Sequence, residues 1–152
     1  MIKILFICHG NICRSPMALY YFRSLLSERG LSGRIWADSA ATSAEEIGNP
    51  VHHGTRAKLD QAGISCDGHR ARQMTRNDYK AFDYLIGMDG WNIRNMERIA
   101  GGDPEHKIHK LMEFTGSGRD VADPWYTGDF ETTWRDVTEG CGALLDYILE
   151  HC

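Results

Sequence analysis

Apolar residues follow two different spacings along the chain, and each spacing predicts a different kind of element. Residues 2–7 form a nearly continuous apolar run rich in β-branched side chains, which is typical of a strand buried on both faces of a parallel sheet. Shorter apolar runs predict further strands, and apolar residues at helical spacing predict helices between them. The predicted strands are 2–7, 34–38, 82–88 and, more weakly, 107–111, and the predicted helices are 15–30, 55–62, 91–99 and a long one that begins at Asp129.

The alternation of strands and helices predicts an α/β fold. We expect a three-layer sandwich around a central, mostly parallel four-stranded sheet, of the flavodoxin-like or Rossmann-like kind. No repeat or linker divides the sequence, so residues 1–152 are expected to form a single domain. Ligands of such sheets bind beyond the carboxyl ends of the strands, which directs attention to the loop after the first strand.

Composition and charge narrow the function classes. The 152 residues include 17 Lys+Arg and 21 Asp+Glu, a net charge of −4, and 42% are hydrophobic, which excludes intrinsic disorder. No window reaches the roughly 18 apolar residues of a membrane helix, and a mildly acidic surface does not suit duplex nucleic acid. The five cysteines cannot all be paired in one chain, and the sequence lacks a signal-peptide pattern, so we expect a cytoplasmic protein.

The loop between the first strand and the first helix has the composition of an anion site. Unpaired N–H groups and the dipole of the following helix favour an anion, and Gly10 and Asn11 can adopt left-handed conformations that turn successive amides inward. The guanidinium of Arg14 offers two parallel donors for phosphate oxygens. The same field favours the thiolate of Cys8, although a buried structural cysteine on an ordinary turn is the alternative.

The segment Gly-Asn-Ile-Cys-Arg-Ser-Pro after an N-terminal strand resembles the low-molecular-weight protein tyrosine phosphatase family, whose signature is a cysteine, five residues, an arginine and a serine. The resemblance covers nearly the whole chain. It implies hydrolysis of phosphotyrosine in proteins and of small aryl phosphates, with no metal or cofactor, with Cys8 as the nucleophile and Arg14 as the phosphate-binding cation. The other residues that it places against the phosphate are His9, Gly10, Asn11, Ile12, Cys13 and Ser15.

A second segment, Asp123-Pro124-Trp125-Tyr126, resembles the general-acid loop of the same family. Expelling a phenolate requires a proton donor at the bridging oxygen, because the parent phenol has a pKa of about 10. Asp123 would supply that proton, whereas Asp-Pro taken alone is only a turn signal. Trp125 and Tyr126 suit either the core or the walls of a pocket, and such walls would be too deep for phosphoserine to reach Cys8.

The resemblance also implies a hydrogen-bonded network that supports the phosphate loop. Its expected members are Asn11, Ser15, Ser39 and His69, with Asp89 orienting His69. Ser15 is expected both to cap the first helix and to donate to the Cys8 thiolate. Taken singly, Ser39 also suits a turn at the end of a strand, and His69 suits a core or surface histidine.

Cys13 lies in the same short loop as Cys8. The resemblance implies that a disulfide between these two cysteines protects the nucleophile, as the family is known to do. Alternatively, Cys13 is a small apolar side chain that only fills space.

Three positions depart from the family pattern and leave the substrate preference open: His9 replaces an uncharged residue, Ala41 a frequent glycine and Glu45 a frequent aromatic residue. The other histidines lack the spacing of a closed metal site, so we expect no metal ligands.

We expect phosphotyrosine-containing proteins as partners, phosphate and similar oxyanions as inhibitors, and a monomer that binds neither nucleic acid nor membrane. Four rival functions share parts of the pattern. An arsenate reductase needs a downstream cysteine relay, but this chain has no cysteine between Asp67 and Gly140. A relative that cleaves phosphoarginine has threonine where this chain has Ile12. A phosphocarrier, or a module that only binds anions, has no need of Asp123.

Overall fold

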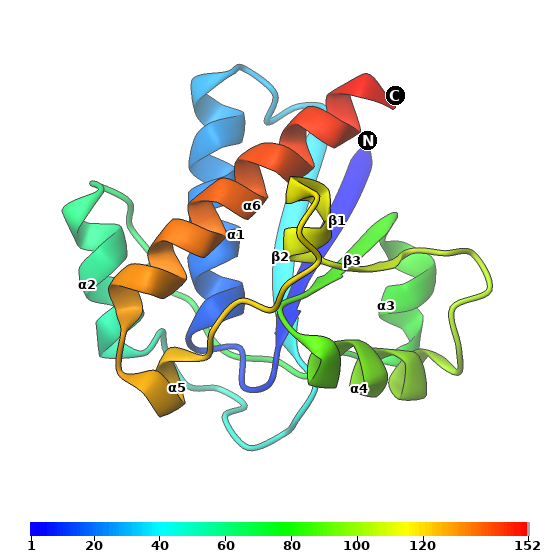
Figure 1. Ribbon diagram of the computed structural model, residues 1–152, viewed down its shortest axis with the longest axis horizontal. Helices are drawn as coiled ribbons and strands as arrows, with labels where there is room; N and C mark the ends of the chain where they lie inside the picture. Colours follow the sequence, from blue (N-terminus) through cyan, green and yellow to red (C-terminus); the bar gives the residue numbers. More distant parts are fainter. Residues whose placement is uncertain (152) are drawn as a thin grey trace.

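The computed structural model describes residues 1–151, and Cys152, one of the five cysteines counted above, lies outside them. Figure 1 shows strands and helices in alternation along the chain. The strands are β1 Ile2–Cys8, β2 Ile35–Ala41, β3 Tyr84–Gly87 and β4 Ile108–Lys110. The helices are α1 Arg14–Glu28, α2 His53–Gln61, α3 Arg76–Ala81, α4 Gly90–Ala100, the 3-10 helix η1 Leu111–Thr115, α5 Pro124–Thr127 and α6 Phe130–Glu150.

The strands form a four-stranded sheet in the order β2-β1-β3-β4, and every pair of neighbours is parallel. This arrangement confirms the predicted parallel α/β sandwich. The chain leaves β1 toward β2 on one side of the sheet and leaves β3 toward β4 on the other. The loops that follow β1 and β3 therefore diverge, and a site forms between them at the carboxyl end of β1. Cys8 is the last residue of β1, so it lies at that position.

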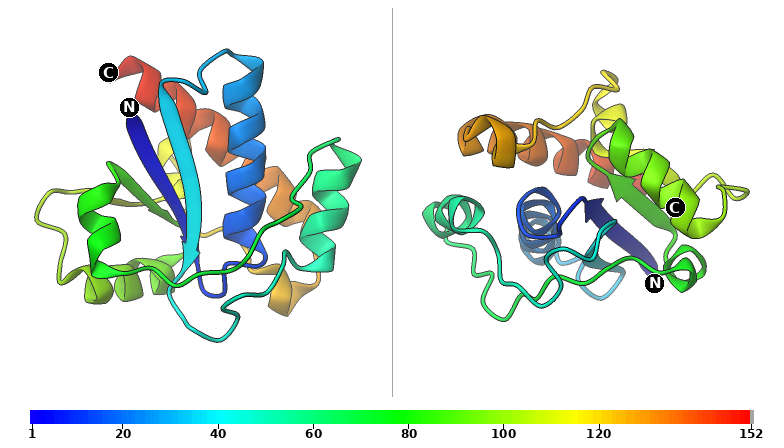
Figure 2. Two further views of the ribbon diagram at one scale, coloured as in Figure 1. Left: turned by 180° about the vertical axis from the view of Figure 1, so that it is seen from behind. Right: turned by 90° about the horizontal axis from the view of Figure 1, so that it is seen from below.

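Two hydrophobic layers explain why the first strand is apolar at successive positions. Ile4 and Phe6 belong to the cluster that packs against α1 and α6, whereas Leu5 and Ile7 belong to the cluster that packs against α3 and α4. Figure 2 shows these two pairs of helices on opposite sides of the sheet. Helix α2 packs outside the sandwich, against α1 and α6. The core therefore holds β1 rigidly from both faces.

The observed elements differ from the predicted ones mainly at their ends. Helix α1 begins at Arg14, with Cys13 at the N-cap position and no capping side chain, so the prediction that Ser15 caps this helix was wrong. Strand β2 extends to Ala41, and α2 begins at His53 because the side chain of His52 accepts from the Gly54 N–H. Helices α3 and α5 and the η1 turn were not predicted, because each is at most six residues long and shows no apolar periodicity.

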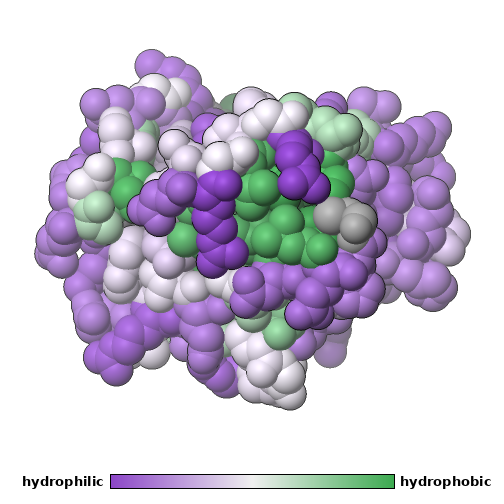
Figure 3. Space-filling view, turned by 90° about the horizontal axis from the view of Figure 1, so that it is seen from above, coloured by the Kyte–Doolittle hydropathy of each residue, from purple (hydrophilic) through white to green (hydrophobic). Residues whose placement is uncertain are grey.

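The two ends of the sandwich have different surfaces. Figure 3 shows the end where the strands begin, with hydrophobic side chains gathered near its centre and hydrophilic side chains around them. The loops that follow the strands lie at the opposite end. Within residues 1–151, no helix combines the length and the hydropathy that crossing a membrane requires.

Candidate active site

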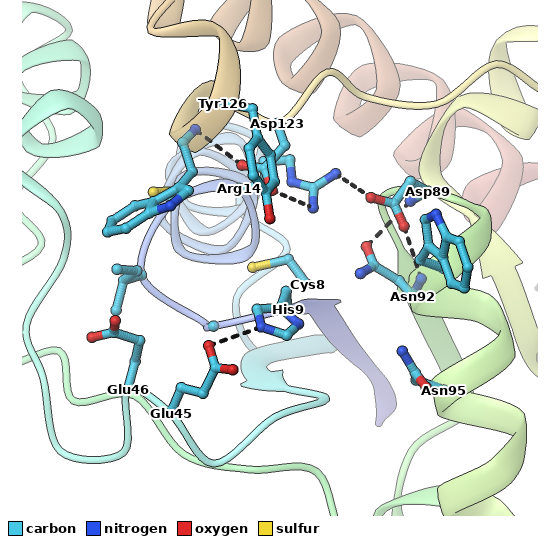
Figure 4. A pocket seen from close by; sticks show the side chains of 15 residues that line it. Cys8, His9, Arg14, Glu45, Glu46, Asp89, Asn92, Asn95, Asp123 and Tyr126 are labelled. Carbon is cyan, nitrogen blue, oxygen red and sulfur yellow. Dashed lines mark hydrogen bonds and ion pairs between the residues drawn. The ribbon is translucent and has the colours of Figure 1, made fainter.

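The loops at the carboxyl end of the sheet enclose a cavity of about 410 Å³, shown in Figure 4. Most of the predicted site residues line it, and the others lie behind the loop that forms its floor. The lining residues among them are Cys8, His9, Gly10, Ile12, Cys13, Arg14, Asp89, Asp123, Trp125 and Tyr126. Asn11, Ser15, Ser39 and His69 are buried behind the loop. Segments more than 100 residues apart therefore meet at this site.

Asn11 gives the phosphate loop its curvature. Its φ of 59° lies in the left-handed region, which asparagine tolerates better than most residues. The expected left-handed conformation is present at Asn11 but not at Gly10. The small size of Gly10 serves a close approach instead, because a Cβ there would lie 3.3 Å from Cγ of Glu46.

The side chain of Asn11 ties three segments together. Its Nδ2 donates to Ser15 Oγ and to Ser39 Oγ, both at 2.8 Å, and its Oδ1 accepts from the Arg72 N–H at 3.2 Å. Asn11 and Ser15 are fully buried and Ser39 nearly so, so each of these groups depends on the others for its hydrogen bonds. The predicted network around the loop therefore exists, with the Arg72 backbone as an additional member.

Two donors converge on the sulfur of Cys8, which is only 3% exposed. The Ser15 N–H donates to Sγ at 3.4 Å, and Ser15 Oγ lies 3.1 Å from the same atom. Because Ser15 Oγ already accepts from Asn11, its own proton is directed to the sulfur. Both donors are placed to stabilise negative charge on the sulfur. The hydroxyl that was expected to cap α1 is thus directed at the sulfur of Cys8.

Arg14 lines the cavity, and two carboxylates hold its guanidinium in place. Nη1 donates to Asp89 Oδ2 at 2.8 Å and to the Val121 carbonyl at 2.9 Å, and Nη2 donates to Asp123 Oδ2 at 3.3 Å. Burial alone would lower the pKa of Arg14, but the negative charges of Cys8, Asp123 and Asp89 raise it above its ordinary value. The cation is therefore permanent and fixed in orientation.

Asp123 projects into the cavity from the N-cap position of α5. Its Oδ1 accepts from the Trp125 N–H at 3.0 Å, which leaves Oδ2 on the side of Arg14. The side chain is 24% exposed, so solvent reaches it from the mouth of the cavity. The Asp-Pro pair thus starts a short helix whose dipole and cap hold the carboxyl group in place.

His69 supports the loop from behind, but the prediction that Asp89 orients it was wrong. His69 Nε2 lies 2.9 Å from the carbonyl oxygen of Asn11, and the Tyr20 hydroxyl lies 3.2 Å from Nδ1. Since a carbonyl can only accept, Nε2 carries the proton of the neutral ring and Nδ1 accepts from Tyr20. Burial lowers the pKa of His69, which keeps the ring neutral. Asp89 bonds to Arg14 instead, because the turn before α4 points it across the cavity.

The mouth of the cavity is aromatic on one side and acidic on another. Trp125 and Tyr126 are 59% and 84% exposed, so they belong to the walls and not to the core. On the acidic side of the mouth, His9 Nε2 lies 3.1 Å from Glu45 Oε2. Figure 4 shows this pair beside Glu46, below the Asp123 and Tyr126 side.

Cys13 lines the same cavity with a thiol that resists ionisation. Burial raises the pKa of Cys13 to about 12, and the negative charges of Cys8 and Asp123 add to this effect. The four cysteines within residues 1–151 are all free. Across these residues, no group of three or more His, Cys, Asp or Glu side chains is placed to hold a metal ion.

Comparison with known families agrees with this geometry. The family model described as low molecular weight phosphotyrosine protein phosphatase matches residues 3–151. The chain belongs to this family. A phosphatase of the family from Bacillus subtilis, YfkJ, is 46% identical over 150 residues, which cover 97% of this chain and 96% of YfkJ. The crystal structure of YfkJ gives a TM-score of 0.96 at 44% identity and covers 99% of this chain and 96% of its own.

Solved phosphatases with this fold differ in the activity that their names state. SP-PTP, a low molecular weight protein tyrosine phosphatase from Streptococcus pyogenes, gives a TM-score of 0.87 at 40% identity and covers 99% of each chain. DARP, a Drosophila arginine phosphatase, gives a TM-score of 0.88 at 27% identity and covers 97% of this chain and 98% of its own. The fold alone therefore does not select the phosphorylated side chain.

Sequence reasoning missed several residues that line the cavity of this phosphatase. Glu45 was noted as a departure from the family pattern but was not counted among the site residues, and Glu46, Trp91, Asn92 and Asn95 were not considered as site residues. A signal for the residues of α4 was present, because they directly follow a predicted strand and so belong to its carboxyl end. No comparable signal existed for Glu46, which lies in a loop without regular structure.

Proposed function

We propose that the protein hydrolyses phosphotyrosine in proteins, and small aryl phosphates, through a phosphocysteine intermediate, with residues 1–152 acting as one domain. The observation that carries the proposal is the place of Arg14 in one cavity with Cys8 and Asp123, close enough that both negative charges act on its guanidinium. A nucleophile, an anion-binding cation and an acid have no other shared purpose. Membership of the family supports the same reaction.

In the first step, Cys8 Sγ attacks phosphorus. The S–P bond forms as the bond between phosphorus and the aryl oxygen breaks. Arg14 and the inward-facing loop amides hold the three other phosphate oxygens, whose charge they stabilise best in the transition state. The two donors on Cys8 stabilise the negative charge of the sulfur when it leaves phosphorus in the second step.

Asp123 handles the proton in both steps. Its protonated carboxyl donates to the departing phenolate. Oδ1 accepts from the Trp125 N–H and Oδ2 from Arg14 Nη2, and these two contacts hold the carboxyl group in the cavity. The carboxylate that remains then takes a proton from water, which attacks phosphorus and breaks the S–P bond. Inorganic phosphate and the Cys8 thiolate are released. The cycle uses only groups of this chain.

The walls of the cavity favour an aromatic ester. Trp125 and Tyr126 are exposed and stand beside Asp123, where the ring of phosphotyrosine would stack on them. Phosphoserine, which lacks a ring, would have to bring its peptide backbone into the cavity to reach Cys8. We therefore propose phosphotyrosine-containing proteins as partners, oxyanions such as phosphate as competitive inhibitors, a monomeric enzyme that needs neither nucleic acid nor membrane, and a reducing cytoplasm as its compartment, where free thiols persist.

The first experiment measures phosphate release from matched peptides that carry phosphotyrosine, phosphoserine or phosphoarginine, in the presence of chelator and reductant. Release from phosphotyrosine alone, abolished in Cys8→Ser and retained in the surface control Asp60→Ala, is the expected result. A preference for the phosphoarginine peptide would show that phosphotyrosine is not the substrate. A phosphocysteine that accumulates without turnover would show that the protein is a phosphocarrier and not a hydrolase.

A second experiment isolates the role of Asp123. With a series of aryl phosphates, Asp123→Ala should lower kcat/KM by about 10²–10⁴ for phenols that are poor leaving groups and much less for good ones. The reason is that only poor leaving groups need the proton. An equal loss across the series would remove Asp123 from the acid role.

We also propose that Cys13 protects the nucleophile. Peroxide would oxidise the Cys8 thiolate to a sulfenic acid, and the Cys13 thiol would then form a disulfide with Cys8 and release water. Thiol would reduce that disulfide and restore activity. Peroxide-treated Cys13→Ser should recover less activity under thiol than the wild type, and equal recovery would contradict this role.

A further inference from the structure

Three of the large apolar side chains that the protein exposes surround the same cavity. Trp91, Trp125 and Tyr126 are 71%, 59% and 84% exposed, and each lines it. The proposed reaction uses Trp125 and Tyr126 beside the phenyl ring, but it gives Trp91 no role. Exposed tryptophan at the edge of a binding cavity is typical of a contact surface for a partner.

Trp91 is held in a fixed position relative to the phosphate site. It is the second residue of α4, whose first turn is closed by reciprocal bonds between Asp89 and Asn92. Asp89 in that turn also bonds to Arg14 at 2.8 Å. The indole and the guanidinium that binds phosphate therefore share one rigid support.

Arg94 leaves the cavity side of this indole available. Its guanidinium lies over the Trp91 ring, 4.9 Å from the centroid, which restrains the ring by a cation–π contact. Arg94 lines a neighbouring hollow between α4 and β4, whereas Trp91 lines the active-site cavity. The guanidinium thus approaches the indole from outside the cavity.

Charges on the two sides of the cavity bear on which side chain of a ligand can reach the indole. Glu45 and Glu46 line the cavity, and Figure 4 shows both on the side opposite Asn95 of α4. These carboxylates disfavour an acidic side chain, and the Arg94 guanidinium disfavours a second cation at the same ring. An aromatic or aliphatic side chain meets neither penalty and gains contact with the indole.

We propose that Trp91 and Asn95 form a second subsite, which takes the aromatic or aliphatic side chain next to phosphotyrosine in a substrate protein. The phosphotyrosine ring lies on the Trp125 side, where Asp123 must reach its oxygen, and the neighbouring residue crosses to α4. Asn95 offers an amide donor and acceptor to the backbone of that residue. The subsite rests on the proposed function and names the substrate class of the same cavity.

The test compares phosphotyrosine peptides that differ only in the residue directly before or after phosphotyrosine, which is Phe, Leu, Ser, Lys or Glu. Each kcat/KM is divided by that for para-nitrophenyl phosphate, which has no flanking residue, so that loss of folded enzyme cancels. Trp36→Ala is the matched control, because Trp36 is also exposed and lies under an arginine at 5.0 Å, but outside the cavity.

The wild type and Trp36→Ala should prefer Phe or Leu over Ser by about fivefold or more, and Trp91→Ala should lose most of that preference. A preference that survives in Trp91→Ala, or a wild-type preference for Lys, would overturn the subsite while aryl phosphate hydrolysis continues. Absence of aryl phosphate hydrolysis in the wild type would overturn the proposed function and the subsite with it.

Discussion

Replacing Asn11 by alanine tests how the phosphate loop keeps its shape. The substitution removes the hydrogen bonds from Nδ2 to Ser15 and Ser39 and the bond from the Arg72 N–H to Oδ1. Water does not replace the two serine hydroxyls, since Ser15 is fully buried and Ser39 is 2% exposed, whereas the bond from the Arg72 N–H is partly buried. Alanine must also adopt a φ of 59°, which asparagine tolerates and alanine resists.

The structure gives the size of the effect. Two buried hydrogen bonds and one partly buried one, at about 1 kcal/mol each, contribute about 3 kcal/mol to the free energy of unfolding. The left-handed conformation adds about 1 kcal/mol for alanine, so Asn11→Ala should lose about 4 kcal/mol. Asn11→Gly loses the same bonds without the conformational penalty, and should be more stable than Asn11→Ala by about 1 kcal/mol.

Urea unfolding, followed by tryptophan fluorescence, measures these differences, and Ser39→Ala provides the control that removes a single bond. A double-mutant cycle between Asn11→Ala and Ser39→Ala should show a coupling of about 1 kcal/mol. Both Asn11 variants should also lose kcat/KM, because the loop amides no longer face the phosphate. An Asn11→Ala protein that is destabilised by less than about 1 kcal/mol would refute the reasoning from hydrogen bonds.

Three further predictions concern other parts of the fold. Burial lowers the pKa of His69 below its ordinary value of 6.5, so the unfolded chain binds a proton at a higher pH than the folded protein does. The urea midpoint should therefore decrease as the pH is lowered below 6.5, and it should decrease less steeply in His69→Gln. Asp89→Asn should lower kcat/KM by about 10- to 100-fold, because the active-site guanidinium loses its orienting charge. Gly140→Ala should destabilise α6 by about 1–3 kcal/mol in urea, because its Cβ would lie 2.5 Å from Cγ of Leu111, whereas Gly142→Ala, with no atom near, should not.

The sequence predicted those parts of the site that are local. The loop from Cys8 to Ser15 is one short segment between a buried strand and a helix, so its chemistry can be inferred from neighbouring residues. The conformation of Asn11 follows from the same local reasoning. The Asp123 segment was also identified locally, although its four-residue helix was read as a turn.

Long-range pairings could not be predicted in the same way. Asp89 is 75 residues from Arg14 and bonds to it only because β1 and β3 are neighbours in the sheet. The sequence analysis expected His69 as the partner of that carboxylate and did not consider Arg14. Likewise, the hydroxyl of Ser15 had two uses, and the early start of α1 at Arg14 decided between them. Strand order and helix phase settle such choices.

The floor and the rim of the cavity differ in how well they tolerate substitutions. Its floor is buried: Cys8, Arg14 and the groups behind them exchange hydrogen bonds with one another, so that a substitution there disturbs several partners at once. Its rim consists of exposed side chains such as Trp91, Trp125 and Tyr126, which the core does not need. Surface substitutions of this kind usually change stability by about 0.5 kcal/mol or less. Variation at the rim can therefore redirect the enzyme to new protein substrates while the chemistry at phosphorus stays the same.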